Sequence, residues 1–103
     1  GESGSSRGGS VRLASGVGSA KSGDVEVSSS PSAATGRVLI GSGSSQLGPS
    51  GELVLVSGDS ESEAGTVSLM AGSSQAGGGA NLNLAGGDTL GYASEGGDVG
   101  IAS

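Results

Sequence analysis

Residues 65–74 read Gly-Thr-Val-Ser-Leu-Met-Ala-Gly-Ser-Ser, in which two aliphatic residues, Val67 and Leu69, are separated by one spacer. Aliphatic residues at positions i and i+2 face the same side of an extended strand, so this spacing predicts a short β-strand with one apolar face. Gly65 precedes the pair and Gly72 follows it, at points where the chain can turn sharply. The stretch therefore predicts one short strand between two corners.

The same pattern occurs seven times, at intervals of about fourteen residues. A repeat of this length with one short strand predicts an all-β fold, a single-stack parallel β-solenoid of the β-helix or β-roll type. We expect one domain, residues 1–103, built from seven coils, in which the aliphatic pairs form a buried core ladder. These aliphatic pairs are Val11/Leu13, Val25/Val27, Val38/Ile40, Leu53/Leu55, Val67/Leu69, Leu82/Leu84 and Val99/Ile101.

Small residues stand at fixed positions around the pairs. Two residues before each pair the chain has Gly in six repeats and Ala80 in the other, which predicts a corner entering each strand. Small residues also follow most pairs, as in Ser15-Gly16 and Ser57-Gly58, which predicts a second corner. We therefore expect a narrow coil with one aliphatic wall and one wall of Gly, Ser and Ala.

Composition by itself favours a different interpretation. Gly and Ser together supply 47 of the 103 residues, as in flexible linkers and disordered segments. Against this, 14 of the 20 Val, Leu and Ile residues fall in the aliphatic pairs, a placement that a random coil has no reason to adopt. The solenoid is the favoured prediction and disorder its alternative.

Charge and residue usage exclude several classes of function. The net charge is −6 with only four basic residues, which argues against nucleic acid and anionic membranes as partners. No apolar run approaches the roughly 20 residues that cross a bilayer. The chain has no Cys and no His, so we expect no disulfide, no cofactor and no metal site of Cys or His ligands. A cysteine-free chain suits an extracellular or cell-surface location.

Catalysis is not expected. Without His or Cys the usual nucleophile–base pairs cannot be built, and the serines around Lys21 are explained by the turns. Gly86-Gly87-Asp88 begins like the nonapeptide of calcium-binding β-rolls but does not continue it. The acidic turn at residues 59–63 leaves weak calcium binding open as an alternative. We therefore predict no enzyme and no catalytic residue.

The two ends of the chain are in phase with each other. The sequence stops directly after the last aliphatic pair and starts with what reads as the second half of a coil. Solenoid ends without polar caps expose strand edges, which predicts end-to-end assembly or a longer array; the alternative is that the two ends fall in phase by chance. The residues expected to carry end-to-end contact are Val11, Leu13, Val99 and Ile101.

Two spacers within the pairs are apolar although spacers should face outward. These are Leu39 and Val54, and Val56 and Met70 lie just beyond the strands of neighbouring coils. Scattered apolar residues are common on protein surfaces, so this can be ordinary exposure. The alternative prediction is a lateral contact strip made by these four residues.

The Gly/Ser-rich aliphatic repeat of residues 65–74 resembles the long low-complexity repeats of microbial and algal surface proteins and adhesins. The resemblance covers the whole chain and implies an extracellular structural or adhesive role, with other copies of the chain or surface glycans as partners. We therefore expect a fibre-forming structural protein that assembles end to end.

Ice binding is the alternative function. Val54-Leu55-Val56-Ser57-Gly58 resembles the β-roll ice-binding proteins of grasses in its period and in its strand–Ser–Gly rhythm. The chain departs from other solenoid antifreezes because its three Thr residues form no Thr-x-Thr rank. A flat wall of Ser, Gly and Ala would have to order the water instead.

Overall fold

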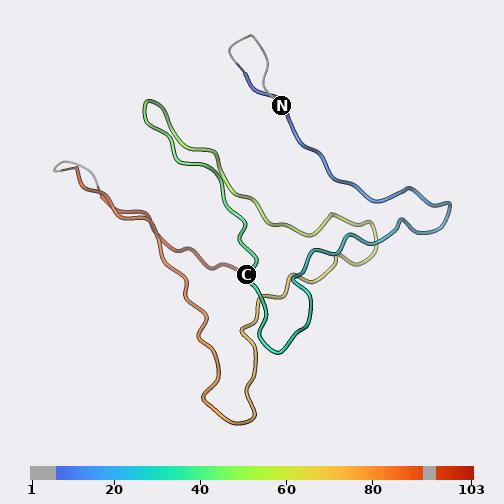
Figure 1. Ribbon diagram of the computed structural model, residues 1–103. Helices are drawn as coiled ribbons and strands as arrows, with labels where there is room; N and C mark the ends of the chain where they lie inside the picture. Colours follow the sequence, from blue (N-terminus) through green and yellow to red (C-terminus); the bar gives the residue numbers. More distant parts are fainter. Residues whose placement is uncertain (1–6, 92–94) are drawn as a thin grey trace. The chain divides into compact units, whose positions relative to one another are not determined.

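The computed structural model describes residues 7–91 and 95–103. Over these ranges the chain forms no helix and no β-strand, and Figure 1 draws it as a succession of loops. The prediction of an all-β parallel solenoid with seven coils and uncapped ends is therefore wrong. The expected extent of the domain, residues 1–103, stays a prediction.

Backbone hydrogen bonding explains why no solenoid forms. Three backbone–backbone hydrogen bonds join described residues, whereas a folded domain has about one internal hydrogen bond per residue. A stacked strand needs a continuous ladder of such bonds to its neighbour. The aliphatic pattern determines which side chains share a face, but it does not specify a partner strand. Ordering the 24 Gly residues would also cost more backbone entropy than ordering any other residue type.

The accessible surface of the chain confirms that it has little interior. It measures 10425 Å² for a mass of 9.4 kDa. A folded monomer of this mass exposes about 5,000 Å², and its extended chain about 13,600 Å². The chain thus exposes about twice the surface of a globular protein of its size, and its order lies in local turns.

The chain divides into two units, Gly1–Leu53 and Val54–Ser103, called the first and the second unit below. Each unit contains three loops, where a loop is the segment between consecutive aliphatic pairs. We name the residue two positions after a pair the exit position and the residue two positions before the next pair the entry position. In both units the loops close where the exit and entry positions meet.

In the first unit, serine hydroxyl groups close two of the three loops by hydrogen bonds. The Ser15 hydroxyl donates to the Gly23 carbonyl at 2.6 Å, and the Gly23 amide donates to the Gly16 carbonyl at 3.1 Å. The Ser29 hydroxyl donates to the Gly36 carbonyl at 2.9 Å. In the third loop, a Cβ atom added at residue 51 would lie 3.8 Å from the Cβ of the serine at the exit position. All three loops of the first unit are therefore closed at the same register.

In the second unit, backbone groups close two of the three loops. The Ala80 amide donates to the Gly72 carbonyl at 3.4 Å, and the Gly97 amide donates to the Gly87 carbonyl at 2.8 Å. Ser57 lies opposite Gly65, the entry glycine of its loop. A Cβ atom added at Gly65 would lie 3.9 Å from the Cβ of Ser57. The register matches that of the first unit, although the atoms that close the loops differ.

Glycine is required at the base of the last loop. A Cβ atom at Gly86 would collide with the carbonyl group of Gly97 on the opposite arm. The two arms approach so closely because neither carries a side chain at these positions. This close approach makes the last loop the most sensitive of the six to substitution at its base.

Hydroxyl groups accept hydrogen bonds from the backbone at several of the loop tips. The chain bends at 19–20, 32–34, 46–48, 61–62 and 75–77, between the closing residues of five loops. The sequence Ser-Ser-Gln-x-Gly occurs at residues 44–48 and 73–77, and in both places the second serine oxygen accepts a hydrogen bond from the glycine amide, at 3.3 and 3.0 Å. Such hydroxyl–backbone bonds stabilise turns in place of regular structure.

Candidate functional site

The aliphatic pairs are exposed. The described residues include no buried side chain, and the exposed fraction within the pairs ranges from 48% at Val99 to 95% at Val11. The expected burial of the core ladder is therefore wrong, because no second wall packs against it. The exposed ladder residues are Val11, Leu13, Val25, Val27, Val38, Ile40, Leu53, Leu55, Val67, Leu69, Leu82, Leu84, Val99 and Ile101.

Exposure nevertheless follows the register of the pairs. In every pair except the first, the first member is less exposed than the second, as with Val99 at 48% and Ile101 at 89%. Aliphatic residues in the middle of the loops are fully exposed: Val17 at 97%, Leu47 at 102% and Leu90 at 100%. The loop bases therefore partly shield the first aliphatic residue of each following pair.

The most shielded residues share one position in the repeat. Four described residues are half-buried, and all four stand at exit positions: Ser15, Ser29, Ser57 and Gly86. These are the residues that lie against the opposite arm of their loop. The sequence pattern correctly marked this position as small, but it did not reveal that the exit and entry positions would meet within one loop. The short separation between the exit and entry positions could have indicated this contact. It is eight residues for the Ser15–Gly23 bond and seven for the Ser29–Gly36 bond.

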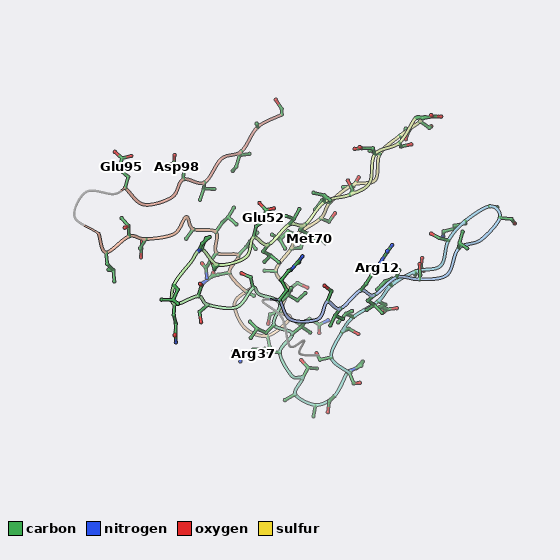
Figure 2. All side chains as sticks on the ribbon, turned by 90° about the horizontal axis from the view of Figure 1, so that it is seen from above. Arg12, Arg37, Glu52, Met70, Glu95 and Asp98 are labelled. Atoms are coloured by element: carbon green, nitrogen blue, oxygen red, sulfur yellow. The ribbon has the colours of Figure 1, made fainter. Side chains whose placement is uncertain are left out.

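The four residues expected to form a lateral strip are all exposed. Leu39 belongs to the first unit, whereas Val54, Val56 and Met70 belong to the second. Figure 2 shows Met70 among the labelled side chains. Lateral contact through these residues stays a prediction.

The four residues expected to carry end-to-end contact are also exposed. Val11 and Leu13 lie in the first unit, and Val99 and Ile101 lie in the second. The expected fibre of stacked solenoid ends has lost its structural basis, because the described residues form no strand whose edges could pair. The apolar side chains themselves remain available for contact.

Chemical sites are not evident in the described part of the chain. Residues 7–91 and 95–103 form no cavity and no cluster of three potential metal ligands. The acidic residues of the turn at 59–63 do not form such a cluster either. Over the same ranges no helix is long and apolar enough to cross a membrane. The absence of catalysis, cofactor and metal stays a prediction from the sequence.

Comparison with protein-family models, with curated proteins and with solved structures finds no match for this chain. The resemblances to surface-protein repeats and to grass ice-binding proteins therefore stay predictions. The periodic row of exposed aliphatic pairs, set between closed loops, is the feature from which function can be argued.

Proposed function

We propose that this chain is a non-catalytic structural segment that associates with other copies of itself through its aliphatic pairs. The observation that carries the proposal is that all fourteen side chains of the pairs are exposed, at a regular spacing, in a single chain. Exposed apolar groups gathered at set positions favour contact with another surface over contact with water.

The free energy available from such contact is substantial. Fully burying one Val, Leu or Ile side chain contributes about 1.5–3 kcal/mol. The loops between the pairs consist largely of Gly, Ser and Ala, so few bulky side chains separate one pair from the next. Burial of only a few pairs would therefore support a stable contact between chains.

The regular spacing favours a second copy of the chain as the partner. Two copies carry their pairs at the same intervals of about fourteen residues, so several pairs can meet at once. Once the first pairs are in contact, each further contact forms at a high effective concentration. A partner with another spacing would match one or two pairs only.

The proposal includes an extracellular or cell-surface location, which the resemblance to surface-protein repeats implies and which suits a chain without free thiols. It does not include ice binding. An ice-binding surface required a flat wall of stacked coils, and the described residues form no such stack. The proposal also needs no solenoid and no strand pairing.

Sedimentation equilibrium of the full chain over a range of concentrations tests the proposal. We expect a dimer or larger species whose population grows with concentration. The variant Val67→Ser/Leu69→Ser removes one pair and should weaken association about tenfold or more, the equivalent of 1.4 kcal/mol.

The matched control is Leu47→Ser/Leu90→Ser, which removes two aliphatic residues that lie outside the pairs. This control should associate nearly as the unchanged chain does. A chain that stays monomeric at all concentrations would overturn the proposal. Equal weakening in both variants would show non-specific hydrophobic association, in which the pairs have no special role.

A further inference from the structure

The two units carry different charges. The first unit holds four basic and four acidic residues and is net neutral, whereas the second holds six acidic residues and no basic one. The whole net charge of −6 therefore lies in the second unit. The basic residues are Arg7, Arg12, Lys21 and Arg37, and the acidic residues of the second unit are Asp59, Glu61, Glu63, Asp88, Glu95 and Asp98.

Charges of opposite sign also occupy the same register in the two units. Two residues before the entry position, the first unit has Arg7 and Lys21, and the second unit has Glu63 and Glu95. We call this the charged position. Each of these charges thus stands four residues before an aliphatic pair, and Lys21, Glu63 and Glu95 lie on the arm of a loop.

The charges at this position are exposed to solvent. Lys21, Glu63 and Glu95 are all exposed, and none of the three forms an ion pair within the described ranges. Figure 2 shows the side chains of Glu95 and Asp98 projecting from the ribbon. The side chain of Arg12 in the first unit projects in the same way. These side chains can meet charges on another molecule without first breaking an internal contact.

From this arrangement we infer that two copies associate with the first unit of one chain against the second unit of the other. The inference rests on the proposed function and adds its orientation. The partner is a second copy of this chain, because the cations in the first unit and the acids in the second share one register. A twofold arrangement makes two equivalent contacts of this kind, each pairing a first unit with a second unit.

Electrostatics selects this orientation over the alternative. Two second units placed side by side would bring six acidic residues against six others with no cation between them. The mixed arrangement places Lys21 near Glu63 or Glu95 of the other copy. Exposed ion pairs add little affinity but strongly disfavour like-charged arrangements, so the aliphatic pairs supply the affinity and the charges supply the orientation.

Lys21 permits a direct test because it is the only lysine in the chain. Ordinary and ¹⁵N-labelled full chains are mixed and treated with a carbodiimide, which joins the Lys21 amine to a carboxylate in contact with it. Mass spectrometry then identifies products that contain one labelled and one unlabelled chain. We expect these mixed products to join Lys21 to Glu63 or Glu95, with a several-fold lower yield in high salt, where screening shortens the range of the charges.

Two variants with the same change in net charge serve as a matched comparison. Glu63→Gln/Glu95→Gln should lower the yield of mixed product several-fold. Asp24→Asn/Glu26→Gln, in the first unit, should leave that yield nearly unchanged. Lys21→Arg keeps the charge and should abolish the product that joins Lys21 to Glu63 or Glu95, because arginine does not form the amide; a mixed product that remains is joined through the α-amino group.

The outcomes separate this inference from the proposed function. A chain that sediments as a monomer at every concentration overturns both. A chain that self-associates but links Lys21 to Asp24, Glu26 or Glu52 of the other copy overturns the orientation alone. The orientation is equally overturned if a self-associating chain gives cross-links only within single molecules.

Discussion

The two units have the same loop architecture but differ in net charge. Each closes three loops at the exit and entry positions, yet the first unit is net neutral and the second carries the whole charge of −6. The comparison shows that the small residues and the charged residues of this chain have different roles. Small residues determine where each loop closes, and charges distinguish one unit from the other.

The largest expected effect comes from making the first unit as acidic as the second. The variant Arg12→Glu/Lys21→Glu/Arg37→Glu removes three of the four cations and adds three acids, so both units carry a net charge of −6 and every arrangement of two copies becomes repulsive. We expect self-association at low ionic strength to weaken about 10- to 100-fold, with a smaller effect in high salt. Sedimentation equilibrium at two ionic strengths measures the difference.

The control for this variant keeps every charge, as Arg12→Lys/Lys21→Arg/Arg37→Lys, and should associate like the unchanged chain. An unchanged dissociation constant in the acidic variant would mean that the charge difference between the units has no part in association. The aliphatic pairs would then act alone.

A smaller effect is expected from changing how one loop of the second unit closes. In Gly86→Ala the new methyl group meets the carbonyl group of Gly97, so the two arms must separate and the hydrogen bond from Gly97 to Gly87 is lost. We expect the nuclear Overhauser contacts between the arms to disappear, while the contacts in the other loops stay.

Gly100→Ala is the matched control, because a Cβ atom at Gly100 meets nothing within 4 Å. It should leave the contacts between the arms of the last loop intact. If Gly86→Ala also kept these contacts, the base of the loop would not be as close as the structure describes.

The smallest effect concerns the hydroxyl groups that close loops in the first unit. Ser15→Ala removes the bond to the Gly23 carbonyl, which is exposed and therefore contributes at most about 1 kcal/mol. We expect the nuclear Overhauser contact between residues 15 and 23 to weaken but not to vanish, because the Gly23 amide still donates to the Gly16 carbonyl.

Ser57→Ala provides the comparison within the second unit. Ser57 makes no hydrogen bond in the described part of the chain, so its contact with the entry glycine should keep its intensity. Equal weakening in both variants would show that the hydroxyl group is not what distinguishes the closures of the two loops.

The sequence predicted which positions carry small residues but not where the chain turns. Gly23 and Gly36 were expected at corners, yet the chain bends at 19–20 and 32–34, and the carbonyls of these two glycines instead accept hydrogen bonds from serine at the loop bases. Stacking of the coils was predicted wrongly because it depends on pairing between distant segments. A one-residue spacer, as in Val67-Ser68-Leu69, places two side chains on one face without specifying what covers them.

The candidate site was predicted by residue but not by environment. The aliphatic pairs were identified from their spacing and assigned to an interior, yet Leu53 and Leu55 are both exposed. An interior requires a second apolar wall, and the other side of each repeat offers only Gly, Ser and Ala. The same fact supports the proposal that the pairs are covered by another molecule.

The short separation of the loop-closing residues affects how such a chain can change in length. Ser15 closes onto a glycine eight residues away, and Ser29 onto one seven residues away. Each loop therefore carries its complete set of closing groups within a single repeat of the sequence. Unequal recombination that added or deleted one whole repeat would leave every remaining loop with its own closing pair, so chains of different repeat number would keep the same local structure.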